Sequence, residues 1–142
     1  MMPTTRRTIA SLLAGVLISA AMSASGAERW VALPDQPDSY AALDAGSVQR
    51  MPSGPISAWV RVEASNRAGK RSLQRMFGAF RGDMADFLYT IDCRTRQFSV
   101  SRSKLYQGAL TVAEKQFGND AAWQQVEGVG LAGAVARQLC TG

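Results

Sequence analysis

Hydrophobic and polar residues alternate along several short segments, a pattern that is typical of β-strands with one buried face. The clearest segment spans residues 56–63, where every second residue is apolar, and residues 87–93 repeat the pattern. Two further runs, 97–106 and 109–114, follow after short polar turns. Together these segments predict an antiparallel meander with one buried and one wetter face.

Earlier in the chain, shorter apolar runs are separated by residues that favour turns. They cover residues 30–33, 39–43 and 48–51, with Pro, Asp and Gly between them. Such spacing predicts further short strands, so we expect a sheet of about six in total.

The last element has a different period. Leu131, Val135 and Leu139 recur every four residues, which predicts a helix with one apolar stripe. A sheet followed by one terminal helix gives the expected fold class, a single α+β domain.

Residues 64–83 show no sustained pattern and are polar, basic and rich in glycine. We expect a long exposed connection there. Leu73, Met76 and Phe77 have helix-like spacing, which leaves a short helix open.

The N-terminal segment has the three parts of a cleavable secretory signal. Arg6 and Arg7 precede an apolar run over residues 9–21, and Ser25-Gly26-Ala27 offers small residues before a charged stretch. The run is shorter than the roughly 20 residues of a spanning helix, although an uncleaved anchor is the alternative. We therefore expect residues 1–27 to be a signal peptide and residues 28–142 to form a periplasmic or secreted domain without a membrane span.

The signal region lacks the cysteine of a lipoprotein attachment site. The adjacent arginines leave twin-arginine and general secretory export both open. In an exported chain, the two cysteines Cys93 and Cys140 predict one structural disulfide that ties the terminal helix to a central strand. A redox pair or a metal site is disfavoured by their wide spacing and by the lack of histidine.

Composition argues against several functional classes. The chain has 16 Lys and Arg, two of them in the signal, against 11 Asp and Glu, so the mature domain is mildly basic. This excess suits acidic proteins or glycans and is too small to indicate nucleic acid. Histidine, the commonest general base, is absent, and no nucleophile–base pairing is visible. We expect no catalytic site, cofactor or metal.

Basic residues concentrate in the predicted hairpin and in the connection before it. A surface of this kind could bind an acidic or glycosylated partner, although ordinary solubilising charge explains it equally well. The candidate partner-binding residues are Arg94, Arg96, Arg102, Lys104, Arg71 and Arg75.

Two other features have weaker functional readings. Arg81-Gly82-Asp83 spells the integrin-recognition tripeptide, for which chance is the better explanation. Trp30, Trp59 and Trp123 are expected to pack in the core or on the sheet, with Trp59 on the wetter face.

The order of several landmarks resembles the surface-adhesin protein E family of bacterial exported domains. These landmarks are Trp30, Tyr40, Asp44, Ser47-Val48, Arg50, Trp59-Val60-Arg61, Tyr89, Asp92-Cys93, Trp123 and Cys140. The resemblance implies an antiparallel sheet with a disulfide-tied C-terminal helix, and adhesion to host extracellular-matrix or serum glycoproteins. It does not decide between a monomer and a homodimer. The missing lipoprotein cysteine departs from the lipid-anchored pattern and favours a periplasmic role.

Two other functions remain open from the sequence. A small exported β domain with a disulfide could inhibit a secreted enzyme such as lysozyme, which would require residues 64–83 to be ordered. An envelope structural factor without a diffusible ligand is the third reading.

Overall fold

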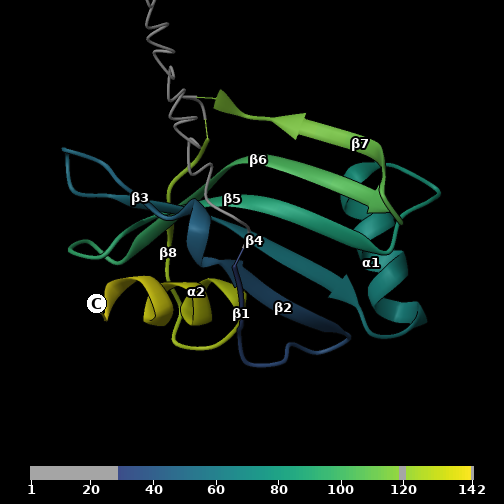
Figure 1. The fold of residues 1–142 in the computed structure, drawn as a ribbon, viewed down its shortest axis with the longest axis horizontal. Coiled ribbons are helices and arrows are strands. Elements are labelled where there is room, and N and C mark those ends of the chain that lie inside the picture. The colour runs from purple at the N-terminus through teal and green to yellow at the C-terminus, as the bar shows by residue number, and fades with distance from the viewer. Residues whose placement is uncertain (1–28, 119–120, 142) are drawn as a thin grey trace, which may run out of the picture.

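The computed structural model describes residues 29–118 and 121–141, so the expected signal peptide lies outside the described residues. The fold is a single α+β domain, as the sequence predicts: an eight-stranded antiparallel sheet with two α-helices (Figure 1). The strands are β1 (Trp30–Ala32), β2 (Ser39–Asp44), β3 (Gln49–Arg50), β4 (Ile56–Ala64), β5 (Met84–Asp92), β6 (Gln97–Gln107), β7 (Leu110–Gln116) and β8 (Gln124–Gln125). The helices are α1 (Arg67–Phe77) and α2 (Leu131–Cys140), with a 3-10 turn η1 (Ala45–Ser47).

The main strand order is β1-β2-β4-β5-β6-β7, and all pairs are antiparallel. The sheet has eight strands rather than about six. β3, of two residues, lies within the predicted run 48–51 and pairs with the end of β4, whereas β8, also of two residues, was not predicted and pairs with the end of β6. Strands this short carry no alternation, so β8 leaves no pattern that a sequence reading could detect.

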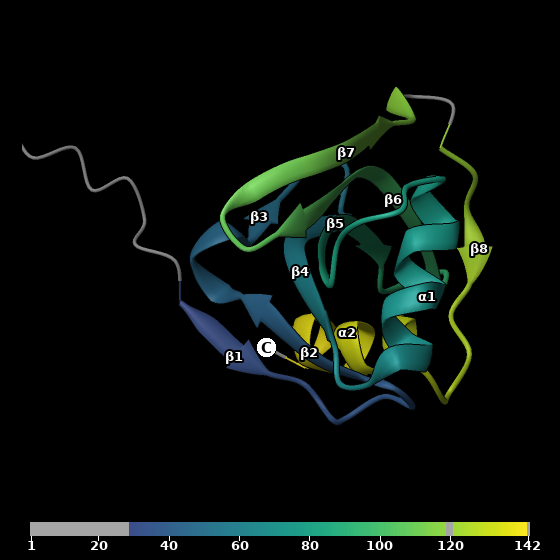
Figure 2. The same ribbon diagram turned by 90° about the vertical axis from the view of Figure 1, so that its right-hand side faces the viewer.

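One face of the sheet forms the core. The alternating residues of β4 and β5 meet across the strands there, with Val60 opposite Phe87 and Ala58 opposite Tyr89. Both helices lie on this side of the sheet (Figure 2). We call this the helix-covered face, and the opposite one the open face.

A β-bulge in β6 changes which residues face the core. Leu88 of β5 pairs with Arg102, but the next residue, Tyr89, pairs with Val100, so Ser101 has no opposite residue. The extra residue reverses the alternation. In a regular strand, residues five positions apart point to opposite faces. Because of the bulge, Val100 and Leu105 both face the core, and Arg102 faces the open side.

The expected exposed connection contains an ordered helix, α1. Asn66 caps its first turn by accepting a hydrogen bond from the Gly69 N–H (3.0 Å), and Gly78 ends it in a left-handed conformation (φ 64°). Leu73 and Phe77, one turn apart, are buried against the sheet, and the Phe77 ring lies 6.1 Å from that of Phe87. The helix is therefore stabilised by tertiary packing, whereas its outer face is basic.

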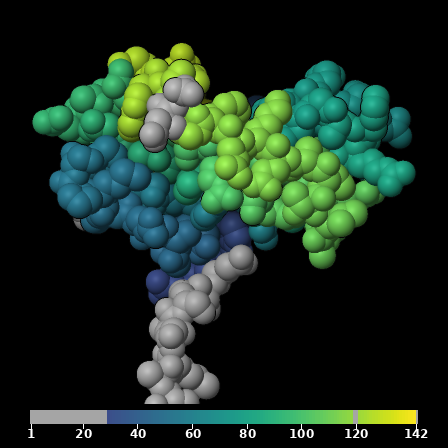
Figure 3. All heavy atoms as spheres, turned by 90° about the horizontal axis from the view of Figure 1, so that it is seen from above, coloured from purple at the N-terminus to yellow at the C-terminus, as the bar shows by residue number. Residues whose placement is uncertain are grey.

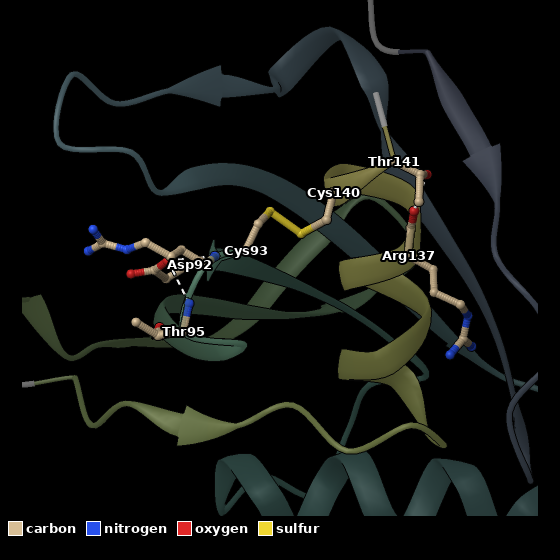
Figure 4. The surroundings of a disulfide bond; sticks show 7 residues. Asp92, Cys93, Thr95, Arg137, Cys140 and Thr141 are labelled. Atoms are coloured by element: carbon tan, nitrogen blue, oxygen red, sulfur yellow. Dashed lines mark hydrogen bonds between the residues drawn. A yellow bond between two sulfur atoms is a disulfide. The ribbon is translucent and has the colours of Figure 1, made fainter.

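The disulfide between Cys93 and Cys140 is present, with a Cα–Cα distance of 5.7 Å. It joins the β5–β6 turn to the last residue of α2 (Figure 4). Val135 and Leu139 of the predicted apolar stripe are buried in the core. Beside the bond, the backbone N–H of Thr95 donates to the Asp92 carboxylate and holds the pKa of that group below its usual value. The turn that carries Cys93 is thus fixed from both sides.

We expect Tyr89 to make the stability of the fold depend on pH in the alkaline range. Burial raises the pKa of this phenol to about 12. In the unfolded chain it ionises near pH 10, so the unfolded state loses its proton first as the pH rises. We expect the free energy of unfolding to fall by on the order of 2 kcal/mol between about pH 10 and pH 12.

Denaturant unfolding at about pH 9 and about pH 11, combined with an ultraviolet titration of tyrosinate, measures this effect. The Tyr89→Phe variant is the control, because it should lose that part of the alkaline decline. An unchanged decline in the variant would show that Tyr89 is not its source.

Candidate binding site on the open face of the sheet

The open face carries a continuous row of charged side chains across neighbouring strands. In the register, Arg61 of β4 lies opposite Asp86 of β5, Asp86 opposite Lys104 of β6, and Lys104 opposite Glu114 of β7. Neighbours of alternating sign stabilise each other across a sheet. The row is therefore a consequence of strand register, and it brings together residues that are far apart in the chain.

Arg61 is fixed at the centre of this face. Its Nε and Nη2 atoms each donate to one oxygen of the Asp86 carboxylate at 2.8 Å, a paired geometry that restricts the guanidinium in both distance and plane. Its Cζ atom also lies 4.2 Å from the ring centroid of Trp30 and 6.0 Å from that of Tyr106, within the range of cation–π attraction. Residues of four strands, β1, β4, β5 and β6, thus meet at one guanidinium.

Trp59 forms a second cluster beside the first. The Arg102 Cζ atom lies 5.7 Å from its ring centroid and the Lys104 Nζ atom lies 5.9 Å away. The backbone N–H of Trp59 donates to the Ser47 hydroxyl of η1 (2.9 Å), which fixes the strand at this point. Two cations therefore lie close to one indole that is itself partly exposed.

Arg102 is incompletely paired. Its Nη2 atom lies 3.5 Å from the Glu114 carboxylate, a long contact, whereas its Nε is buried and has no hydrogen-bond partner among the described residues. A buried donor without an acceptor destabilises the folded state by roughly 1–3 kcal/mol.

Two hollows adjoin this cluster. The smaller, of about 210 Å³, is lined by Trp30, Asp44, Trp59, Asp86, Lys104 and Tyr106. The larger, of about 530 Å³, is lined in part by Arg102, Trp123 and the hydroxyl side chains of Thr90, Ser99 and Ser101. Because Arg102 lies over Trp59, it connects the two hollows. We call Trp30, Trp59, Arg61, Asp86, Arg102, Lys104 and Tyr106 the aromatic–cation site.

Two ionisable groups at this site have shifted pKa values. Burial, together with the negative charge of Asp86, raises the pKa of Tyr106, so its hydroxyl is neutral at physiological pH. A hydrogen bond from the Gln116 side chain lowers the pKa of Glu114, which is therefore a carboxylate. The site thus offers neutral hydroxyls and indoles, two cations near Trp59, and carboxylates that are already engaged.

The structure separates the basic residues proposed from sequence into three places. Arg102 and Lys104 belong to the aromatic–cation site, whereas Arg94 and Arg96 occupy the β5–β6 turn. Six residues of strand separate Arg96 from Arg102, which corresponds to about 20 Å. Arg71 and Arg75 lie on the exposed side of α1, at the opposite end of the sheet from that turn (Figures 1 and 3). They do not form one continuous surface.

The integrin-like tripeptide lies in the loop between α1 and β5. Arg81 and Asp83 are exposed, but Gly82 is buried with φ 122°, and a Cβ atom there would overlap the Leu105 side chain. The Asp83 N–H donates to the Tyr106 carbonyl (3.0 Å), and the Gly82 carbonyl accepts from the Gln74 side chain (3.1 Å). Packing therefore accounts for the glycine without a receptor.

Sequence reasoning missed Trp30, Arg61, Asp86 and Tyr106 as members of a site. The alternation places Trp59 and Arg61 on one face of β4, and Lys104 and Tyr106 on one face of β6. The sequence of each strand alone shows which of its side chains share a face. It does not show how neighbouring strands are aligned, and that alignment brings these residues together.

No protein-family model matches the chain, and neither a curated protein nor a solved structure matches it. The resemblance to surface-adhesin protein E thus stays a prediction from the order of landmarks. Within residues 29–118 and 121–141, no helix is long and apolar enough to cross a membrane. In the same ranges, no group of three or more Cys, Asp or Glu residues has the arrangement of a metal site.

Proposed function

We propose that this chain is an exported, non-enzymatic binding protein that binds an acidic or glycosylated partner, such as a host matrix or serum glycoprotein, through the aromatic–cation site. The observation that carries the proposal is the placement of both Arg102 and Lys104 within about 6 Å of the centroid of the partly exposed Trp59 ring. The resemblance to surface-adhesin protein E supports the same class of partner.

The chemistry of the site suits an acidic glycan. An indole face packs against the apolar C–H faces of a sugar ring, and the neighbouring hydroxyls can bond to its polar edges. A guanidinium pairs with a carboxylate or sulfate through charge-assisted hydrogen bonds, and the Arg102 side chain is 42% exposed with only a long contact, 3.5 Å, from its Nη2 to Glu114. These features together support recognition of a sugar that carries an anionic group.

The buried carboxylate supports binding rather than catalysis. Asp86 is 7% exposed, and both of its oxygens accept hydrogen bonds from Arg61. A buried carboxylate whose two oxygens are both hydrogen-bonded within the protein is poorly placed to reach a substrate proton.

Reversal of two charges tests the proposal. The Arg102→Glu/Lys104→Glu variant should lose on the order of tenfold or more in affinity for an immobilised matrix glycoprotein, because both cations beside Trp59 are removed. Binding by the wild type should weaken as salt is added, since exposed charges are screened within about 8 Å at physiological ionic strength. Surface plasmon resonance measures both effects.

The matched control is Arg94→Glu/Arg96→Glu, which changes the net charge equally but at the β5–β6 turn. It should bind nearly as the wild type does, and melting temperatures show whether each variant is folded. Enzymatic removal of the partner's glycans distinguishes a glycan from an acidic protein segment. Equal losses in the two double variants would show that only net charge matters and would reject this site.

An inhibitor of a secreted enzyme is a second candidate, favoured by one observation. The segment that this function requires to be ordered contains α1 and a loop that projects Phe80, whose side chain is 98% exposed. Hydrogen bonds fix the loop on both sides, from the Ala79 N–H to the Gln74 carbonyl and from the Asp83 N–H to the Tyr106 carbonyl. In a lysozyme assay, inhibition that is lost in Phe80→Ala but kept in Arg102→Glu/Lys104→Glu would favour this candidate.

A further inference from the structure

A cavity of about 430 Å³ lies on the helix-covered face, on the other side of the sheet from the aromatic–cation site. Its walls come from the sheet, from the loop before β2, from α1 and from the start of α2. Most of them are apolar, and the side chains that matter for its shape are Val62, Leu73, Phe77, Phe87, Val100 and Leu131. The cavity opens to the surface, and its volume lies within the range of roughly 300–1,000 Å³ that is typical of small-molecule sites.

Two polar groups line the inner part of the cavity. Ser103 and Tyr89 both belong to its wall and are 4% and 7% exposed. The raised pKa of Tyr89 keeps its hydroxyl neutral, so neither group introduces a charge. The interior therefore suits an apolar molecule.

The rim carries a cation. The Nζ atom of Lys115 donates to the Met76 carbonyl at 2.6 Å and lies 5.9 Å from the centroid of the Phe77 ring. Met76 and Phe117, which also line the cavity, are both about half exposed at 52% and 46%. An ammonium group is thus held beside an apolar opening.

The carboxylate that lines the same cavity lies at the other end of α1. Asp38 packs against Gly69, and its Oδ1 atom accepts a hydrogen bond from the Asn66 side chain (2.7 Å). Lys115 contacts Met76, seven residues further along the helix, which is a rise of about 10 Å. A negative group at Lys115 would therefore be well separated from Asp38.

We infer that this cavity binds a single-chain amphiphile with an anionic head, a fatty acid in its simplest form. The acyl chain lies between α1 and the sheet, and the carboxylate pairs with Lys115 at the rim. Charge complementarity selects this occupant over a neutral apolar molecule. The inference goes beyond the proposed function and is independent of it, because the two sites are on opposite faces.

Isothermal titration calorimetry with dodecanoate, kept below its micelle concentration, tests the inference. We expect saturable binding at one site per chain. The Lys115→Gln variant should bind dodecanoate up to about fivefold more weakly, as expected for one exposed ion pair. Its affinity for dodecanol, the neutral molecule of equal chain length, should not change. Lys115→Arg keeps the positive charge and should bind dodecanoate with nearly the affinity of the wild type. Lys70→Gln, which removes a charge elsewhere on α1, should leave that affinity unchanged.

A steric variant tests the location. Ser72 is exposed on α1 and lines the cavity, so Ser72→Phe should fill the opening and abolish binding of both molecules. Ala68→Phe, at an exposed position of the same helix that does not line the cavity, is the control for folding and should bind normally. Failure of the wild type to bind dodecanoate, or unchanged binding by Ser72→Phe, would overturn the inference.

Discussion

Replacement of Cys93 and Cys140 by serine will lower the free energy of unfolding by about 2–5 kcal/mol. The bond closes a loop of 47 residues, and releasing that loop gives the unfolded chain conformational entropy. A domain of this size is typically stable by about 5–15 kcal/mol, so the loss is a large fraction of the total. Denaturant unfolding measures it.

Helix α2 should respond more strongly than the rest of the fold. It has ten residues, and isolated helices shorter than about 12–15 residues are marginal in water. Hydrogen exchange should therefore show loss of protection in α2 before β4 and β5. The reduced wild type should behave as the double variant does. A double variant with unchanged stability would mean that packing of Val135 and Leu139 alone holds the helix.

The Gly82→Ala variant should be destabilised by about 2–5 kcal/mol, the second largest effect that we expect. A φ of 122° is rarely adopted by other residues and costs an alanine about 1–3 kcal/mol. The added Cβ also overlaps Leu105, which is fully buried, and overpacking a core costs a similar amount. Thermal or denaturant unfolding gives the difference.

Gly78→Ala is the matched control. Gly78 also has a positive φ, of 64°, but an added Cβ meets nothing within 4 Å. Its replacement should lower the free energy of unfolding by only about 1 kcal/mol. The additional destabilisation in Gly82→Ala then measures the overlap with Leu105. Similar losses in both variants would show that the overlap relaxes at little cost.

Much of the fold could be predicted because its signals are local. The alternation in residues 56–63 and 87–93 and the stripe of α2 each lie within one element. Helix α1 was expected only as an alternative to an exposed connection, although Asn66 and Gly78 mark its two ends, because Gly69 and the basic residues resemble a loop. Gly69 is in fact buried against the Asp38 carbonyl, where a side chain would not fit.

The candidate site was harder to predict because it depends on register. Arg102 was selected from sequence for its charge alone. Its neighbour Trp59 lies on another strand, and the bulge at Ser101 decides that Arg102 faces Trp59 rather than the core. Neither the pairing of strands nor an irregularity in one of them follows from the period of a single segment.

The contacts of Arg61 have a consequence for the thermodynamics of recognition. Trp30 and Tyr106 are held by the same guanidinium that Asp86 orients, so these side chains would lose little conformational entropy on binding the proposed partner. Immobilising a flexible side chain typically costs about 0.5–1.5 kcal/mol on association. The pairing of four strands already orders the side chains at these positions during folding. A ligand bound here, as proposed, would meet a preorganised surface.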